Sequence, residues 1–196
     1  MQTSKPPKRQ RTKQAITEAG LTLLKQTGTA FTMDELALAA GVSRRTLFNH
    51  FSGKTELLLA IGETSEARYC AFIDQYLGSE VKPEEALISL FESIELQWQR
   101  QGRSAGILYD ALAQARSSEH QAAALQAYTD TFLPHLKLWQ QQQQIHPDIE
   151  LITAAHLLST TLSSAVFMLR ASADRAEYLR YVKLACSAIL PSGADD

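Results

Sequence analysis

Hydrophobic residues recur every three or four positions through most of the chain, which is the spacing that places them on one face of an α-helix. The alternation of apolar and polar residues that is typical of strands does not occur. Clusters of Gly, Pro or Ser separate the periodic segments. The pattern therefore predicts an all-α protein of about nine helices. They are expected over residues 8–26, 32–40, 44–50, 54–77, 83–100, 104–116, 119–144, 147–171 and 174–190.

The N-terminal helices have recognisable start and end signals. Thr32 and Glu35 fit a capping box, in which the Thr32 hydroxyl accepts from the Glu35 amide and the Glu35 side chain bonds back. Ser43 is a suitable N-cap for the helix that follows it. Gly28 suits a left-handed cap after the first helix, and Gly41 permits a tight turn. These signals predict a module of three short helices, followed by a long connecting helix.

The charge of the chain is unevenly distributed. The formal net charge is −2, but residues 1–55 hold nine Lys and Arg against three acids, so this part carries +6 and the remainder −8. A local positive field raises the rate of encounter with phosphate groups. A basic head on an acidic body therefore suits a polyanion-binding module joined to a body with another task. A solvated basic tail is the alternative interpretation.

Residues 32–51 supply the parts of a helix-turn-helix. Their apolar positions are spaced to form a small shared core, and the third helix has polar groups that face outward. Arginine can pair bidentately with guanine and asparagine with adenine, so Arg44, Arg45 and Asn49 are expected to carry sequence specificity. The polar groups better suited to phosphate or sugar are Thr46, His50 and Lys54.

Many positions in and around this segment match one protein family in register. They are Ile16, Ala19, Gly28, residues 31–33, Leu36, Ala37, the run 40–51, Lys54, Glu56 and Leu57. Over about residues 12–61 the chain resembles the TetR-type (tetracycline-repressor-like) regulators. The resemblance implies that the third helix enters the major groove of double-stranded DNA and that the fourth links head to body. It also implies contacts to the DNA backbone from Thr32, Thr46, Phe48, His50 and Lys54.

Two residues depart from the family pattern. Phe48 stands where tyrosine is usual, so a phosphate bond from a phenolic hydroxyl is lost. Arg45 replaces what is often a small residue, and it is expected to add a phosphate or base contact. Some candidates also have structural interpretations, because Lys54 could cap the fourth helix, Thr46 could bond back to a carbonyl and His50 could be a partly packed surface histidine.

The last two predicted helices carry small and apolar residues over most of their surfaces, more than one face of a monomer needs. Two such antiparallel helices could pair with their symmetry mates in a four-helix interface, as they do in the resembled family. An intramolecular core is the alternative. A homodimer spaces its recognition helices about 34–36 Å apart and predicts a palindromic operator. The residues expected at the interface are Leu158, Leu162, Ala165, Val166, Leu169, Tyr178, Val182, Ala185 and Ile189.

Aromatic and polar residues of the body could line a cavity for a small-molecule effector, although core packing explains most of them equally well. The candidates are Phe72, Phe91, Glu95, Trp98, Tyr109, Tyr128 and Phe132. The resemblance implies a repressor in which the ligand shifts the connecting helix and so changes the separation of the two heads.

Two rival functions belong to other classes. A helical metalloenzyme would need Glu-x-x-His or His-Glu-x-x-His spacing, which the sequence lacks, so no metal site, cofactor or catalytic residue is predicted. The letters Gly-x-Ser-x-Gly around Ser104 match a hydrolase nucleophile elbow, but that motif needs a preceding strand where helix is predicted. A helical adaptor that binds a protein partner through the body stays open.

The predicted organisation has four parts. They are a flexible basic tail over residues 1–8, a helix-turn-helix domain over 9–54, an effector-binding and dimerisation domain over 55–190 and a flexible tail over 191–196. Cys70 and Cys186 lie far apart, without the spacing of a disulfide framework or zinc site. No stretch approaches the roughly 20 consecutive apolar residues of a membrane span. A cytoplasmic protein is therefore expected.

Overall fold

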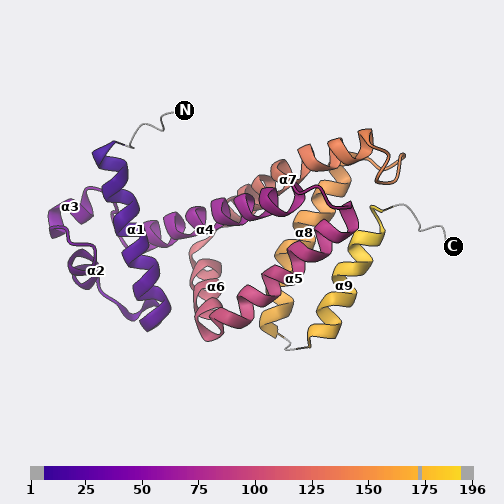
Figure 1. The fold of residues 1–196 in the computed structure, drawn as a ribbon. Helices are drawn as coiled ribbons and strands as arrows, with labels where there is room; N and C mark the ends of the chain where they lie inside the picture. The colour runs from indigo at the N-terminus through magenta and orange to yellow at the C-terminus, as the bar shows by residue number, and fades with distance from the viewer. Residues whose placement is uncertain (1–6, 172–173, 191–196) are drawn as a thin grey trace. The chain divides into compact units, whose positions relative to one another are not determined.

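The computed structural model describes residues 7–171 and 174–190, without the side chains of Arg103, Val166, Arg170 and Ala171. These residues contain nine α-helices, a 3-10 helix (η1) and no strand (Figure 1). The elements are α1 Lys8–Thr27, η1 Gly28–Ala30, α2 Met33–Ala39, α3 Arg44–Phe48, α4 Lys54–Leu77, α5 Pro83–Gln101, α6 Arg103–Ala115, α7 Ser118–Gln141, α8 Leu151–Ala171 and α9 Arg175–Ser187. The predicted all-α class is confirmed.

The end of α7 differs from the prediction, which continued the helix to residue 144. Gln143 has a φ of 58°, and its amide donates to the carbonyl of Gln140 while the amide of Gln144 donates to that of Trp139. These two bonds form a Schellman motif, which ends a helix through one left-handed residue. The Gln140 side chain then donates to the carbonyls of Pro147 and Ile149. The glutamine run therefore forms a turn, and α8 begins four residues later than predicted.

The chain forms two compact units, and their boundaries differ from the predicted ones. Among the described residues, the first unit holds those up to Ser65 together with Gly102–Ser117, and the second holds Glu66–Gln101 and those from Ser118 onward. We call them the head and the body. The head therefore includes α6 and the first part of α4, beyond the predicted limit at residue 54. The reason is that α6 packs on α1 and η1.

The head encloses one apolar cluster. Its buried side chains come from α1, α2, α3, α4 and the segments just before α2 and α4, and α6 adds Ala111, with Ile107 and Leu108 packed against the cluster. The fully buried members include Ile16, Leu24, Leu36, Leu47, Phe51, Leu57 and Ile61. This core fixes the three short helices that carry the candidate DNA-binding residues.

The body has its own core, built mainly from α5, α7, α8 and α9 with the last turns of α4. Two buried polar groups are satisfied inside it. The Thr129 hydroxyl donates to the Ser159 hydroxyl at 3.1 Å, and the Tyr178 hydroxyl donates to the carbonyl of Phe91 at 2.8 Å. Burial raises the pKa of the Tyr178 phenol well above its ordinary value. Such pairing allows polar groups to lie within an apolar core.

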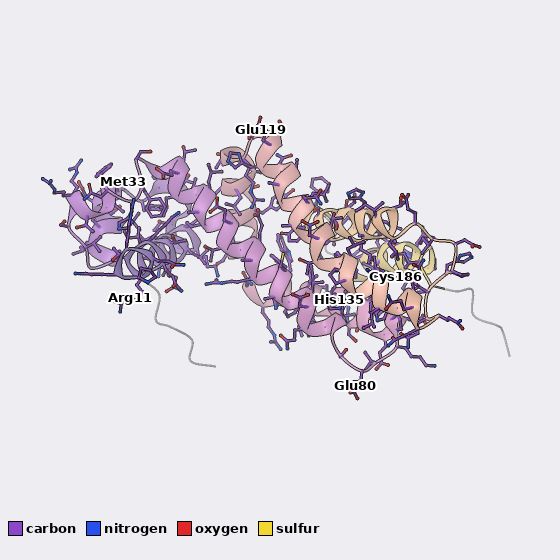
Figure 2. All side chains as sticks on the ribbon, turned by 90° about the horizontal axis from the view of Figure 1, so that it is seen from above. Arg11, Met33, Glu80, Glu119, His135 and Cys186 are labelled. Carbon is purple, nitrogen blue, oxygen red and sulfur yellow. The ribbon has the colours of Figure 1, made fainter. Side chains whose placement is uncertain are left out.

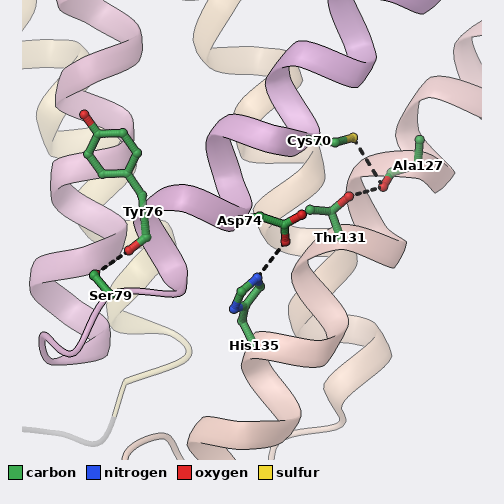
Figure 3. A network of polar contacts seen from close by, with 7 residues as sticks. All are labelled: Cys70, Asp74, Tyr76, Ser79, Ala127, Thr131 and His135. Carbon is green, nitrogen blue, oxygen red and sulfur yellow. Dashed lines mark hydrogen bonds and ion pairs between the residues drawn. The ribbon is translucent and has the colours of Figure 1, made fainter. Parts of the chain in front are cut away.

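Polar contacts join α4 to α7 within the body (Figure 3). Asp74 Oδ1 lies 2.8 Å from His135 Nε2. Nearby, the carbonyl of Ala127 accepts from the Thr131 hydroxyl at 2.8 Å and from the Cys70 thiol at 3.8 Å. The Thr131 bond lies within α7, whereas the contacts of Asp74 and Cys70 connect α4 to α7 and hold the C-terminal part of α4 in the body.

Both cysteines are free thiols, and Cys186 is buried whereas Cys70 is partly buried. Cys186 lies in the body (Figure 2). Burial raises the pKa of the Cys186 thiol to about 12. The thiolate is the reactive form of cysteine, so Cys186 is a structural residue of the body core.

Among the described residues, Leu151–Leu169 of α8 is the single stretch whose length and mean hydropathy of 1.5 would suffice to cross a membrane. About 41% of this stretch is buried inside the chain. It includes core residues such as Leu158 and Leu162, so its apolar character is that of a packed helix and does not indicate a membrane protein.

Candidate nucleic-acid interface

The start of α2 is fixed by the predicted capping box. The Thr32 hydroxyl accepts from the Glu35 amide at 3.2 Å, and Glu35 Oε2 accepts from the Thr32 amide at 2.6 Å. The bond from the Thr32 amide is the main reason that the pKa of the Glu35 carboxyl is lowered from 4.5. Thr32 remains exposed, so it can also meet a DNA backbone.

The turn between α2 and α3 depends on Gly41. Its φ is 64°, and its amide donates to the carbonyl of Leu38 while the amide of Val42 donates to that of Ala37. This is again a Schellman motif, in which the left-handed position favours glycine. A Cβ on Gly41 would meet no atom within 4 Å, so the requirement is for the backbone conformation rather than for space.

Ser43 caps α3, as the sequence predicts. Its hydroxyl accepts from the Thr46 amide at 3.1 Å and lies 2.8 Å from the Thr46 hydroxyl. A capped first turn holds the side chains at the start of α3 in fixed directions. Thr46 is half-buried beside the cap, which supports a structural role for it.

Arg44 begins α3 and has two partners within the head. Its Nη1 lies 3.2 Å from Oδ2 of Asp34 on α2. Its guanidinium carbon lies 5.5 Å from the centroid of the Phe48 ring, one turn further along α3. Phe48 itself is partly exposed, with 40% of its surface accessible. The charged and aromatic groups thus lie together on the accessible side of α3.

The other candidates on α3 and just after it have different exposures. Arg45 and Asn49 are exposed, whereas His50 is half-buried. The amide of Asn49 donates to the carbonyl of Arg45, which closes the C-terminal turn of α3. Arg45 and Asn49 are therefore accessible, as base-contacting residues must be.

Lys54 makes tertiary contacts within the head, whereas the structural alternative expected from the sequence was a cap for the fourth helix. Its ammonium donates to the carbonyl of Thr29 at 2.6 Å and to the carbonyl of Phe31, and it lies 4.6 Å from the centroid of the Phe31 ring. These contacts tie the start of α4 to the segment between η1 and α2. One N–H of the ammonium is left to meet a phosphate.

Asp34 is the residue of this surface that the sequence analysis missed. It lies on α2, ten positions before Arg44, so no local spacing rule pairs the two. The sequence indicates that Asp34 lies in the first turn of the helix before the predicted DNA-contacting helix. That position does not specify which residue its carboxylate pairs with.

Most residues predicted for a dimer interface lie in the core of the single chain. Leu158, Leu162, Ala165, Tyr178, Val182, Ala185 and Ile189 are buried, and Leu169 is partly buried against them. The side chain of Val166 lies outside the described residues. A side chain buried within one chain cannot also face a second copy. These residues therefore correspond to the intramolecular alternative, and a dimer contact made by α8 and α9 would have to use other sides of these helices.

The candidate ligand residues do not form one cluster. Phe91 and Phe132 are fully buried in the body core, and Phe72 and Tyr128 pack against it. Trp98 is half-buried on α5, whereas Tyr109 lies on α6 and so belongs to the head. Because Tyr109 belongs to the head, the seven candidates cannot all line one cavity within the body.

Glu95 is the charged member of that set. Its carboxylate is only 3% exposed, and Oε2 lies 3.3 Å from Nε of Arg175 on α9 while Oε1 accepts from the side-chain amide of Gln99. Buried carboxylates are tolerated when they are paired in this way. Both oxygens already have partners in the chain, so Glu95 joins α5 to α9.

The described residues contain no group of three or more His, Cys, Asp or Glu side chains that could hold a metal ion. Ser104 lies in the first turn of α6, and the segment before Gly102 is helix α5 rather than a strand. The structural context of a hydrolase nucleophile elbow is therefore missing around Ser104.

The capped, exposed third helix and its glycine turn match a known family. A model described as "Bacterial regulatory proteins, tetR family" matches residues 16–61, which span most of α1, all of α2 and α3 and the start of α4. This N-terminal part of the chain is therefore similar to the regulators of the TetR family. The family's all-α fold with an N-terminal helix-turn-helix agrees with the structure.

TetR-type relatives resemble different shares of the chain. The uncharacterized HTH-type transcriptional regulator YvaF of Bacillus subtilis (strain 168) is 37% identical over 79 residues. That match covers 38% of this chain and 42% of YvaF, so it spans less than half of the relative's length. The family model describes regulatory proteins and the relative is a transcriptional regulator, so neither match indicates an enzyme.

Two solved structures extend the likeness to the whole fold. FadR of Thermus thermophilus, a TetR-family transcriptional repressor in complex with lauroyl-CoA, is 25% identical with a TM-score of 0.67, over 94% of this chain and 98% of FadR. The complex of SmeT with triclosan is 17% identical with a TM-score of 0.69, over 93% of each chain. SmeT is the repressor of a multidrug efflux pump of Stenotrophomonas maltophilia.

Proposed function

We propose that the protein is a cytoplasmic transcriptional regulator that binds double-stranded DNA by inserting α3 into the major groove. The observation that carries the proposal is the accessible set of Arg44, Arg45 and Asn49 on a short helix that Ser43 caps. These side chains have the hydrogen-bonding groups that distinguish guanine and adenine at their major-groove edges. The basic character of residues 1–55 supports attraction to phosphate.

The test is selection of binding sites from a randomised DNA library by the purified full chain. We expect an enriched palindromic sequence, because a symmetric dimer presents two copies of α3. Arg44→Ala should relax the preference at one base position per half-site, by about 1–3 kcal/mol. Binding that only decreases with salt, with no enriched sequence, would contradict the proposal.

We infer that the operator is bound by a homodimer whose contacts use the outer sides of α8 and α9. Apolar side chains remain accessible there, although these helices also fill the body core. They are Ile152, Leu157, Phe167 and Leu184, of which Phe167 is 55% and Leu184 73% exposed. Large accessible apolar groups favour burial against a partner. The family resemblance supports the same pair of helices.

Sedimentation of charged variants tests the dimer. Phe167→Glu or Leu184→Glu should shift the protein from dimer to monomer at micromolar concentration, because a carboxylate would have to be buried in the interface. Leu138→Glu on α7 is the matched control, since Leu138 is 49% exposed outside these two helices. An unchanged mass for both α8 and α9 variants would argue against this interface.

We further propose that the protein is a repressor that responds to a small apolar or amphipathic molecule bound in the body. The support is that FadR holds lauroyl-CoA and SmeT holds triclosan within a similar fold. Half-buried Phe72, Trp98 and Tyr128 are the candidate contacts that remain accessible within the body.

Lauroyl-CoA and triclosan are suitable first probes of this response. A bound effector should weaken operator binding by about 5- to 150-fold, which is the usual range of allosteric coupling. Trp98→Ala should reduce that effect without changing operator affinity in the absence of the probe. Unaltered operator binding across a wider panel of apolar acyl and phenolic compounds would count against a small-molecule effector.

A further inference from the structure

The strongest unassigned feature is the arrangement of Asp34, Arg44 and Phe48 on the head. Arg44 Nη1 lies 3.2 Å from Asp34 Oδ2, and the two side chains are 69% and 64% exposed. Ion pairs this accessible contribute between nothing and about 1 kcal/mol to stability. The pair therefore matters little for folding, and its consequence is the direction in which the guanidinium is held.

Two contacts restrict the Arg44 side chain from different elements. The Asp34 carboxylate comes from the first turn of α2, whereas the Phe48 ring comes from the next turn of α3 and lies 5.5 Å from the guanidinium carbon. The capping bonds of Thr32 and Ser43 fix the starts of both helices. Arg44 is therefore restrained relative to both helices of the helix-turn-helix.

Orientation has a chemical meaning for an arginine on a recognition helix. The guanidinium is planar and recognises O6 and N7 of guanine with two parallel N–H groups. A carboxylate that engages one N–H leaves other N–H groups of the same plane available. An apolar ring one turn along the helix can contact the methyl group of a thymine.

We propose that Asp34 is a positioning residue that orients Arg44 for a guanine in each half-site, and so determines specificity at that base pair. The inference rests on the proposed DNA-binding function. If α3 enters the groove, the exposed Asp34 carboxylate, 3.2 Å from Arg44, is also brought close to the DNA. It repels the backbone and so lowers affinity for DNA that offers Arg44 no guanine.

Orientation of Arg44 by Asp34 can be separated from the general effect of a negative charge near DNA. Asp34→Asn removes one negative charge and the ion pair, so it should strengthen binding to unrelated DNA while it weakens the preference for guanine. Glu18→Gln removes one negative charge from α1, where the Glu18 carboxylate accepts a hydrogen bond from the side-chain amide of Gln14. It is the matched control for charge, and Asp34→Glu is the conservative variant that keeps the carboxylate.

The experiment compares these full-length proteins on two duplexes. One carries the site that the wild type selects, and the other has the Arg44-dependent guanine replaced by adenine in both half-sites. We expect Asp34→Asn to reduce the guanine preference about 10-fold, within the range of one bidentate contact. Glu18→Gln should keep the wild-type ratio, and Asp34→Glu should restore most of it. Thermal melting confirms that each variant is folded.

The outcomes separate this inference from the function on which it rests. If the wild type selects a palindrome but Asp34→Asn keeps the guanine preference, the positioning role is wrong and the DNA-binding function stands. Equal loss of preference in Asp34→Asn and Glu18→Gln would show a charge effect and would also overturn the role. If the wild type enriches no sequence, both the function and the inference fail.

Discussion

The ammonium of Lys54 joins the start of α4 to the segment between η1 and α2 through the carbonyls of Thr29 and Phe31. A cation is well suited to this place, because it satisfies two carbonyl oxygens at once and also lies over the Phe31 ring. The contact stabilises the head whether or not DNA is bound.

Replacement of Lys54 by methionine should therefore lower the stability of the protein. Methionine keeps the length of the side chain but leaves the two carbonyls without their donor, so we expect a loss of about 1–3 kcal/mol. Urea unfolding followed by circular dichroism measures it. Lys8→Met in the exposed first turn of α1 is the control. An equal loss in both variants would refute the structural role.

Single residues were predictable where their partners are close in sequence. Thr32 with Glu35 and Ser43 with Thr46 are pairs three positions apart, and both capping arrangements are found as predicted. The Arg44 and Asp34 pair joins two helices across a turn, and its geometry depends on the angle between them. Sequence spacing does not specify that angle, so the pair could not be predicted.

At the scale of elements, the turn that ends α2 determines how α3 is presented. Gly41 adopts a φ of 64°, whereas the open space around it would accept a side chain. The turn therefore depends on the left-handed backbone conformation of Gly41 and not on the space around it.

Gly41→Ala should destabilise the head by about 1–2 kcal/mol, which is the cost of a left-handed conformation for a residue with a Cβ. Gly106→Ala is an informative control, because Gly106 lies within α6 and its added Cβ would meet no atom within 4 Å. That variant should gain about 0.5–1 kcal/mol from helix propensity. Thermal or urea unfolding measures both changes in stability. A loss for Gly41→Ala with a gain for Gly106→Ala would support the left-handed requirement at Gly41, and an unchanged stability for Gly41→Ala would contradict it.

The capping carboxylates make the N-termini of α2 and α4 sensitive to acid. The pKa of Glu35 is lowered by the Thr32 amide, and that of Glu56 by the Ser52 amide, each from an ordinary value of 4.5. A lowered pKa in the folded state means that the stabilisation is present above pH 4.5 and is lost as the pH falls through the lower value.

Unfolding midpoints measured between pH 6 and pH 3 test this dependence. We expect the wild type to lose stability as the two carboxylates are protonated, and the double variant Glu35→Gln, Glu56→Gln to start less stable and lose less over the same interval. Parallel decreases for the two proteins would show that other groups dominate the acid response.

Helix limits were predictable where glycine, proline or a capping residue marks them, as at both ends of α4. The end of α7 was not, because Gln143 takes the left-handed position that glycine usually occupies. The polar side chain of Gln140 then stabilises the turn by donating to two carbonyls. Helix propensity favours glutamine, and here the tertiary contacts outweigh it.

At the scale of the whole molecule, the chain passes between head and body three times, after Ser65, after Gln101 and after Ser117. The sequence predicted one passage, because it treated the helix over residues 104–116 as part of the body. Its amphipathic pattern shows that it has an apolar face but not which neighbour covers that face. The same ambiguity affected α8 and α9, where most of the residues predicted for a dimer interface proved to be buried in the core.

Hydrogen exchange can test the assignment of α6 to the head. Ile107→Ala removes an apolar side chain that packs against the head cluster, with an expected loss of about 1–2 kcal/mol for a partly buried site. Exchange should quicken in α1 amides and leave α9 amides unchanged. Ile152→Ala, at an exposed position of α8, is the control and should alter neither α1 nor α6. If Ile107→Ala accelerated exchange more in α9 than in α1, the assignment of α6 to the head would be wrong.

The packing of α6 on α1 limits how such regulators can be recombined. A chimera joined once, within α4, would combine the DNA-contacting helices of one parent with the α6 of the other. The side chains that pack between α1 and α6 would then come from two different parent proteins, and their shapes would not be matched to each other. A functional exchange needs three junctions, or a donor whose α6 already fits, so new combinations of sensor and operator arise more readily by substitution than by a single crossover.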